Sequence, residues 1–141
     1  MKIFHNIASI QTHLEQHQNV KIGLVPTMGA LHNGHIALIK QAKKNCDLIV
    51  VSIFVNQKQF NRDCDYLTYP KNQSQDIKKI ENIADIAFCP KIATIYPNNF
   101  ATTISVANLS SHLCGKTRSG HFDGVALIIT KLFNIIKPNQ A

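Results

Sequence analysis

The stretch PTMGALHNGH, from Pro26 to His35, joins a short apolar run to a helical pattern and contains two glycines and two histidines. The run before it, VKIGLV, has strand length, and from about Asn33 the apolar residues recur at helical spacing. Gly29 and Gly34 leave room for a ligand to approach the backbone, and the first N–H groups of a helix have no partner within it. Such a junction suits a phosphate, because the helix dipole is positive there.

The two histidines of this stretch, His32 and His35, are three residues apart and lie on one face of the first helical turn, so both can reach the same anion. Imidazole donates a hydrogen bond whether it is neutral or charged, and it would stabilise the charge that develops as pyrophosphate leaves an α-phosphate. The alternative is that the glycines shape a turn and the histidines only cap the helix. A metal site is a poorer interpretation, because no third ligand lies at a diagnostic spacing.

Strand and helix patterns alternate on both sides of this stretch. The expected elements are a short N-terminal strand, helix 7–17, strand 20–26, helix 33–45, strand 48–55, helix 74–84, strand 85–90 and a long amphipathic helix that Pro138 ends. Residues 102–106, TTISV, are read as an extra strand or hairpin arm. The continuous β-branched run in 48–55 is typical of a strand covered on both faces. The sequence therefore predicts an α/β domain with a parallel sheet and right-handed crossovers.

Composition limits the class of protein. The 141 residues suffice for one domain with a single core, and 45% hydrophobic with 16% charged residues indicates a globular chain. No apolar run approaches the ~20 residues that span a bilayer, and the N-terminus shows no signal peptide, so we expect a cytoplasmic protein. The four cysteines lack zinc-site spacing, and we expect them to be reduced and partly buried.

The formal net charge of +7 suits an anionic partner. The basic residues are scattered, however, and the pairs Lys43–Lys44 and Lys78–Lys79 are typical of solvated helix faces. A nucleic-acid-binding domain would need a coherent basic face and exposed aromatic platforms, whereas only 7% of the residues are aromatic. The charge therefore favours a small anionic ligand without identifying it.

A second polar loop, NQKQF (residues 56–60), directly follows the strand predicted over 48–55. In an open α/β sheet, ligands bind beyond the carboxyl ends of the strands, where the strand order switches. Because both this loop and the stretch Pro26–His35 follow strands, we expect the fold to bring them side by side.

Four blocks, in this order and spacing, carry a resemblance to a known family: VPTMGALHNGH, VVSIFVNQKQF, DYLTYP and RSGHFDGVALIITKLFNIIKP. The first contains the HxGH signature of nucleotidylyltransferases and class I aminoacyl-tRNA synthetases. The four together closely resemble the pantoate–β-alanine ligase (pantothenate synthetase) family, from about Lys21 to Ala141. The resemblance implies a Rossmann-like doubly wound parallel sheet of the HxGH nucleotidylyltransferase type. Another HxGH nucleotidylyltransferase and a basic nucleic-acid-binding domain are the alternatives.

The activity that this resemblance implies is the ATP-dependent condensation of pantoate with β-alanine through a pantoyl adenylate, which releases pyrophosphate and AMP. Mg²⁺ would accompany the ATP phosphates, and a homodimer is expected. His35 would be the acid at the phosphates and His32 its partner, while Gln59 would bind pantoate near β-alanine and Asn56 would help to build that pocket. The residues implied to contact ATP are Met28, Gly29, Ala30, Leu31, His32, Asn33, Gly34 and His35.

Six further residues are candidates for the site or for ordinary packing. Val125 and Ile129 on the last helix can face the methyl groups of pantoate, or they belong to the ordinary core. Arg118 and His121 lie where that helix begins and can meet an anion, although Arg118 fits a solvated loop equally well. The two aromatic residues that we expect only to pack are Phe60 and Tyr69.

The chain departs from the family pattern at three places. Gln57 and Ser119 stand where the family usually has proline, which should loosen each loop by roughly 0.4–1 kcal/mol if the proline geometry was compatible. The family also continues beyond KPNQA with another strand, a Lys-Asp-x-Gln-Gln segment and a C-terminal lid domain. We therefore expect residues 1–141 to be an incomplete N-terminal Rossmann-like domain for ATP and pantoate, truncated before its last strands. The edge of the strand KIGLV, Lys21 to Val25, should then be open.

Overall fold

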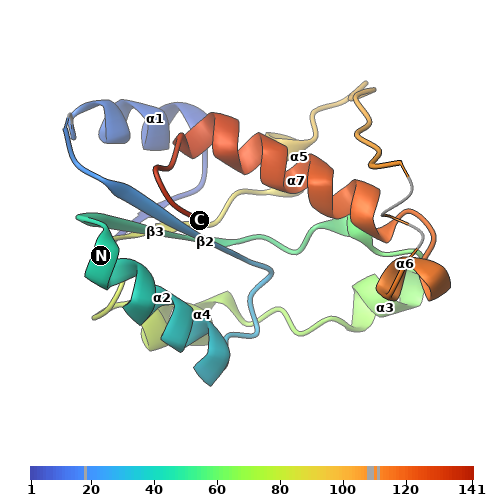
Figure 1. Ribbon diagram of the computed structural model, residues 1–141, viewed down its shortest axis with the longest axis horizontal. Helices are drawn as coiled ribbons and strands as arrows, with labels where there is room; N and C mark the ends of the chain where they lie inside the picture. The colour runs from blue at the N-terminus through green and yellow to red at the C-terminus, as the bar shows by residue number, and fades with distance from the viewer. Residues whose placement is uncertain (18, 108–109, 111) are drawn as a thin grey trace.

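Four parallel strands form the sheet of the computed structural model, which describes residues 1–17, 19–107, 110 and 112–141 (Figure 1). Their order is β1-β4-β3-β2, with β1 at one edge and β2 at the other. The strands are β1 (Lys2–Phe4), β2 (Ile22–Thr27), β3 (Leu48–Ile53) and β4 (Ile86–Phe88). All the pairings between them are parallel, which confirms the α/β class predicted from the alternating pattern.

Helices cover both faces of this sheet (Figure 1). On one face lie α1 (Ile7–Glu15) and α7 (His121–Ile136), and on the other lie α2 (Asn33–Asn45) and α4 (Gln73–Ile80). β3 supplies side chains to both layers, because Leu48 and Val50 join the core under α7 while Ile49, Val51 and Ile53 join the core under α2. The prediction of a strand buried on both faces is therefore confirmed, since every residue of β3 is buried.

β2 is the point at which the strand order switches. One of its edges pairs with β3 from Ile22 to Thr27, and its other edge is met by the last residues of the chain. Leu24 donates its N–H to the carbonyl of Gln140 at 2.8 Å, and Asn139 donates to the carbonyl of Ile22 at 2.8 Å. This return on the far side of β2 makes the sheet doubly wound.

The expectation that the β2 edge would stay open is therefore wrong for the first half of that strand. Pro138 does follow the end of α7 as predicted, but Lys137 adopts a left-handed conformation (φ 50°) that turns the chain back to the sheet at once. Gly23 and Gln140 form a parallel bridge. The strand that we expected to begin beyond Ala141 therefore begins before it.

Three segments differ from the sequence prediction. Residues 102–106 form no strand, because they pair with none of the four strands of the sheet. The helix predicted over 74–84 ends at Ile80, and helix 7–17 ends at Glu15. The connections also contain short helices that the sequence did not indicate: η1 (Gln57–Gln59), α3 (Asp63–Thr68), α5 (Ile92–Ile95) and α6 (Cys114–Thr117).

All four cysteines are free. Cys46 and Cys89 are buried, and Cys64 and Cys114 are exposed. Burial raises the pKa of the Cys89 thiol to about 11, which keeps it protonated and inert near neutral pH. In the part of the chain that the structure describes, no helix has both the length and the apolar character needed to cross a membrane.

Candidate functional site

The loop between β2 and α2 is held in a conformation that needs glycine. Gly29 has a φ of 83° and Ala30 a φ of 51°, both in the left-handed region. A Cβ atom added to Gly29 would lie 2.9 Å from Oδ2 of Asp76. Thr27 anchors the start of the loop, because its hydroxyl donates to the Ser52 carbonyl at 2.7 Å and accepts from the Gly29 N–H at 3.2 Å. Glycine is therefore required here by both backbone angle and space.

Asp76 on α4 holds the middle of this loop, a role that no sequence pattern predicts. Its side chain is 3% exposed, and its two carboxylate oxygens accept the N–H groups of Ala30 at 2.9 Å and Leu31 at 2.8 Å. Lys79, one turn further along α4, donates to the Leu31 carbonyl at 2.6 Å. A single aspartate in a charged helix has no distinguishing pattern, so only the tertiary contact identifies it as part of the site.

His32 and His35 cap the helix that they begin. Nδ1 of His32 accepts the N–H of Gly34 at 3.1 Å, and Nδ1 of His35 accepts the N–H of His32 at 3.3 Å. The two rings lie 4.1 Å apart between centroids and are tilted by 48°. The capping alternative raised by the sequence is thus a structural fact, and it does not exclude a ligand because each cap uses only one ring nitrogen.

The caps also determine which nitrogen of each neutral ring carries the proton. A ring nitrogen that accepts from a backbone N–H is unprotonated, so in a neutral imidazole the other nitrogen, Nε2, is the N–H donor. Both rings therefore offer an Nε2–H group beyond the helix end. The N–H groups of Gly29, Ala30, Leu31, His32 and Gly34 all have acceptors within the protein, so an anion at this helix end meets imidazoles rather than those amides.

The environment of His35 favours its neutral form. Partial burial lowers the pKa of His35 below the ordinary 6.5, the neighbouring His32 lowers it further, and the negative charge of Asp76 opposes both. Protonation would also place a second N–H where Nδ1 now accepts from the backbone. His35 is therefore set up as a neutral hydrogen-bond donor near neutral pH.

His35 and Gln59 line one cavity of about 240 Å³ at the carboxyl ends of β2 and β3. Its apolar wall comes from α7, and it includes Val125 and Ile129, whose side chains are only partly buried. The residues that line it are Pro26, Thr27, Met28, His35, Phe54, Asn56, Gln59, Tyr69, Val125, Ile128, Ile129 and Leu132. Val125 and Ile129 thus lie at the cavity surface, and Ile129 also packs against the core under α7.

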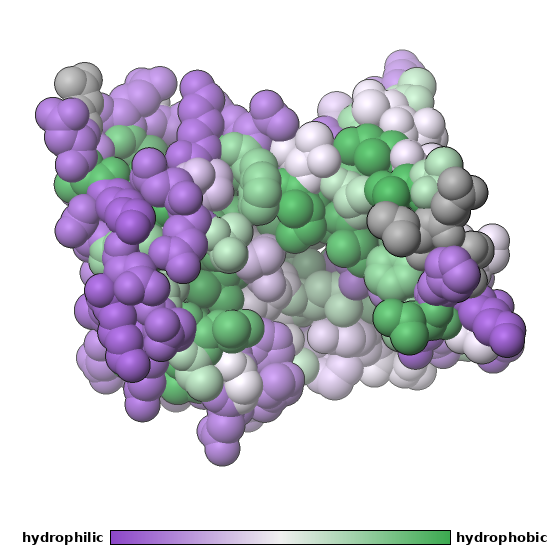
Figure 2. Space-filling model, in the orientation of Figure 1, coloured by the Kyte–Doolittle hydropathy of each residue, from purple (hydrophilic) through white to green (hydrophobic). Residues whose placement is uncertain are grey.

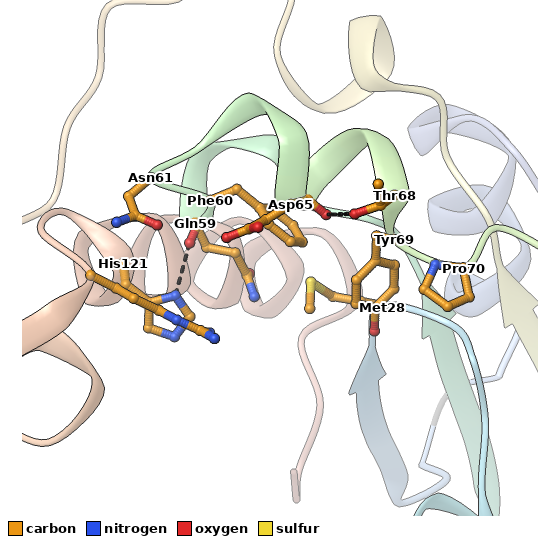
Figure 3. Close-up of a pocket in the computed structure, with 10 residues that line it drawn as sticks. Met28, Gln59, Phe60, Asn61, Asp65, Thr68, Tyr69, Pro70 and His121 are labelled. Atoms are coloured by element: carbon orange, nitrogen blue, oxygen red, sulfur yellow. Dashed lines mark hydrogen bonds between the residues drawn. The ribbon is translucent and has the colours of Figure 1, made fainter.

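A second cavity, of about 380 Å³, adjoins the first and is more polar (Figure 3). The two cavities share three lining residues, Met28, Gln59 and Tyr69, and Met28 lies between the other two in Figure 3. The remaining residues that line the second cavity are Phe60, Asn61, Asp65, Thr68, Pro70, Arg118 and His121. The short helix α3, which the sequence did not predict, supplies Asp65 and Thr68 to this wall.

Phe60 and Tyr69 pack as expected, with ring centroids 5.7 Å apart, but both also line the second cavity. His121 donates from Nδ1 to the Gln59 carbonyl at 2.8 Å, since a carbonyl oxygen only accepts. Its Nε2 is then an acceptor when the ring is neutral. Arg118 also lines this cavity although it is exposed, which fits both an anion-binding residue and a solvated loop charge.

The remaining predicted residues lie outside the two adjoining cavities and do not share one cavity of their own. His32 and Asn33 border a separate depression with Lys79, and Gly29 borders a hollow beside Asp76. Figure 2 shows a hollow near the centre of the visible face with hydrophobic side chains around it, while hydrophilic side chains gather over α1 and α2. The described residues contain no group of three or more His, Cys, Asp or Glu side chains that could hold a metal ion.

Comparisons with known proteins agree on one family. The family model described as pantoate-beta-alanine ligase matches residues 2–141. The pantothenate synthetase of Pseudothermotoga lettingae is 50% identical over 121 residues, which is 85% of this chain and 43% of that protein. The pantothenate synthetase of Saccharophagus degradans is 43% identical across 100% of this chain and 51% of its own length. The chain thus spans about half the length of these relatives.

Solved structures give the same result. The pantoate-beta-alanine ligase of Francisella tularensis, complexed with beta-gamma ATP and beta-alanine, superposes with a TM-score of 0.94 at 44% identity. That match covers 99% of this chain and 54% of the other. The enzyme from Thermus thermophilus gives a TM-score of 0.92 at 36% identity, covering 98% of this chain and 50% of its own. The predicted Rossmann-like, doubly wound fold is confirmed by these matches, as is its status as an N-terminal half.

Proposed function

Because the chain belongs to the pantoate–β-alanine ligase family, we propose that it carries the ATP- and pantoate-binding half of an enzyme that makes pantothenate. Residues 1–141 are then an incomplete N-terminal Rossmann-like domain whose lid lies in the other half. We further propose a cytoplasmic protein that acts as a homodimer. The observation that carries the proposal is the single cavity in which His35, Gln59 and the apolar wall of α7 come together.

Pantoate is placed in the cavity of about 240 Å³. Its geminal methyl groups suit the apolar wall formed by Val125 and Ile129, and its carboxylate and hydroxyl oxygens suit the polar groups of His35 and Gln59. Burial of the methyl groups contributes roughly 0.8 kcal/mol for each. This placement gives Val125 and Ile129 a role in selecting a branched substrate.

ATP is placed along the β2–α2 loop, from Met28 to His35. A pantoate carboxylate oxygen attacks the α-phosphorus, the bond to the bridging oxygen breaks, and pyrophosphate leaves with the electron pair. The Nε2–H groups of His32 and His35 donate to the phosphate oxygens on which charge increases. The helix dipole favours an anion at the same end. Mg²⁺ would be held by the ATP phosphates themselves, since the described residues form no ligand cluster for it.

β-Alanine is placed in the adjoining cavity of about 380 Å³. The Arg118 guanidinium suits its carboxylate and Asp65 suits its ammonium group, while Gln59 lies at the boundary with the pantoate cavity. The amine, once it has lost a proton, attacks the acyl carbon of the adenylate and AMP leaves. Nε2 of His121 is an acceptor in the tautomer that the Gln59 carbonyl requires, so it can take that proton.

The proposal is tested with residues 1–141 fused to the C-terminal half of the Francisella tularensis ligase. We call this fusion protein the joined enzyme. It should form AMP and pantothenate only when ATP, pantoate and β-alanine are all present. Replacing β-alanine by glycine, or pantoate by lactate, provides the substrate controls. Folded joined enzyme that transfers a nucleotide to another acceptor and ignores pantoate would instead support the alternative of a different HxGH nucleotidylyltransferase.

A further inference from the structure

Asn56 is a deeply buried polar residue at the site, with 1% of its surface exposed. It directly precedes η1, and its amide contacts three groups: the Gly124 carbonyl of α7, the side chain of Gln59 and the hydroxyl of Tyr96. Tyr96 follows α5 and lies 40 positions from Asn56 along the chain. These contacts form a chain of hydrogen bonds that ends at the two cavities.

The direction of every bond in this chain follows from one backbone group. The Gly124 carbonyl only accepts, and an Asn56 atom lies 2.9 Å from it, so that atom must be the NH₂ nitrogen. The same nitrogen lies 3.0 Å from the Gln59 side chain, which must therefore present its oxygen, Oε1. The orientation of both amides is thus fixed by chemistry, because turning Asn56 would set two acceptors against each other and turning Gln59 alone would set two donors against each other.

Tyr96 secures the other end of Asn56. Its hydroxyl lies 2.8 Å from Asn56 Oδ1 and donates to it. Burial raises the pKa of Tyr96 to about 12, so the hydroxyl keeps its proton throughout the physiological range. The ring is held between Phe54 and Phe100, with centroids 6.1 and 5.2 Å away. Both polar atoms of the Asn56 amide are therefore held by hydrogen bonds, which prevents the amide from rotating.

Three of the four polar groups of Gln59 have partners among the described residues. Its backbone N–H donates to the Asn56 carbonyl at 3.2 Å, its own carbonyl accepts from His121, and Oε1 accepts from Asn56. The side-chain NH₂ has no acceptor among the described residues, and Gln59 lies at the boundary of the two cavities (Figure 3). The close approach of α7 makes this possible, because a Cβ atom at Gly124 would collide with the Lys58 carbonyl and with Gln59 Cα.

We infer that Asn56 and Tyr96 are positioning residues that fix Gln59 as a hydrogen-bond donor only, so that the bound substrate must present an oxygen acceptor, a carboxylate above all, at this point. A glutamine side chain can in general both donate and accept hydrogen bonds, and the contact with Asn56 removes the second option for Gln59. The inference rests on the proposed function only in naming pantoate as that substrate.

The first test uses the ligand-free 141-residue chain labelled with ¹⁵N. The side-chain NH₂ signals of Gln59 are assigned by their loss in Gln59→Glu. Tyr96→Phe removes only the hydroxyl, and it should shift or broaden the Gln59 signals by freeing Asn56. Tyr66→Phe is the matched control, because it removes a hydroxyl outside the two cavities. Gln59 signals that are the same in Tyr96→Phe and in the unchanged chain would overturn the positioning role.

The second test titrates the same proteins with sodium pantoate. Tyr96→Phe should weaken pantoate binding by about tenfold, the usual effect of one disrupted buried hydrogen bond, and leave ATP binding within twofold. Gln59→Glu keeps an oxygen for Asn56 but points a second, negative oxygen at the substrate, so it should bind pantoate more weakly than Gln59→Ala. Equal or tighter binding by Gln59→Glu would overturn the donor-only assignment.

The two tests separate this inference from the proposed function. If the unchanged chain fails to bind pantoate while Tyr96→Phe still moves the Gln59 signals, the choice of substrate is wrong and the positioning role stands. Asn56→Asp provides a second variant if Tyr96→Phe folds poorly, as judged from its spectrum. A carboxylate cannot donate to the Gly124 carbonyl or to Gln59, so this variant should alter the Gln59 signals as well; unchanged signals would count against the inference.

Discussion

The histidines of the β2–α2 loop use opposite sides of their rings for two tasks. Nδ1 of each ring accepts a backbone N–H of the loop, and in the neutral ring Nε2 then carries the proton that a ligand can accept. Stability and ligand binding therefore depend on the same side chains. Substitution of either histidine should affect both, and the two effects can be separated by measuring folding and rate independently.

His35→Ala in the joined enzyme should slow adenylate formation far more than it weakens ATP binding. The Nε2–H group of His35 donates to charge that is greatest when pyrophosphate leaves, and loss of one such donor typically costs ~10²–10³ in rate. Pyrophosphate release at saturating ATP is the measurement, and His17→Ala, a histidine remote from the loop, is the control. A change of less than tenfold would leave His35 with its capping role alone.

The titration of His35 links this residue to folding. Its pKa is lowered below 6.5 in the folded chain, mainly by burial and then by His32, so the unfolded chain binds the proton more readily. The stabilising contribution of the neutral ring is then present above pH 6.5 and is lost as the pH falls below that value. Urea unfolding at pH values on either side of 6.5 should show that the free energy of unfolding falls more steeply with decreasing pH for the unchanged chain than for His35→Gln. The same pH dependence in both proteins would contradict the lowered pKa of His35.

Gln59→Ala should raise the concentration of pantoate that the joined enzyme needs, with ATP affinity nearly unchanged. The side chain follows β3, whereas the ATP loop follows β2, and removing a partner from a buried polar group of a substrate costs ~1–3 kcal/mol. Separate titrations of the two ligands check this. A larger loss for ATP than for pantoate would refute the role of Gln59.

At the scale of elements, the site depends on helices that touch it from outside the strand-to-helix junction. α4 holds the loop through Asp76, and α7 forms the cavity wall and fixes η1 through Gly124 and His121. The sequence predicted β2, the glycine loop and α2 because their patterns are local. It predicted neither Asp76 nor Tyr96, because each acts on a partner 40 or more positions away.

The same distinction between local patterns and distant contacts explains the errors in the predicted fold. β3 was predicted correctly because a run of buried β-branched residues is visible without its neighbours. Residues 102–106 have similar strand propensity but pair with none of the four strands, so propensity alone gave a wrong prediction. The short helix α3 supplies one wall of a cavity, yet six residues are too few to show a helical period.

Asp76→Asn tests the link between α4 and the loop. An amide offers one oxygen where the carboxylate offers two, so either Ala30 or Leu31 would face an NH₂ group instead of an acceptor. Loss of one such buried partner should lower the free energy of unfolding by ~1–3 kcal/mol, measured by urea denaturation. Asp63→Asn, an exposed aspartate, is the control. Equal stability of the two variants would show that the loop does not need Asp76.

At the scale of the whole molecule, the chain holds the floor of both cavities while about half the length of its relatives lies outside it. We expect the 141-residue chain alone to make pantothenate far more slowly than the joined enzyme, since the lid that we propose to cover ATP and exclude water from the adenylate lies in the other half. A coupled assay of AMP release that depends on pantoate and β-alanine makes the comparison. Rates within tenfold of each other would show that the other half is dispensable.

The return of the chain to β2 has a consequence for the order of events during synthesis. Ile22 donates its N–H to the side chain of Asn139, a partner 117 positions later, so this edge cannot be completed until the last residues emerge. At ~5–20 residues per second, the edge waits about 6–23 s on the ribosome. Contacts of such high sequence separation slow folding, and an unpaired edge is exposed to other nascent chains meanwhile. A ribosome-bound chain shortened before Asn139 should therefore stay accessible to chaperones for as long as translation is paused.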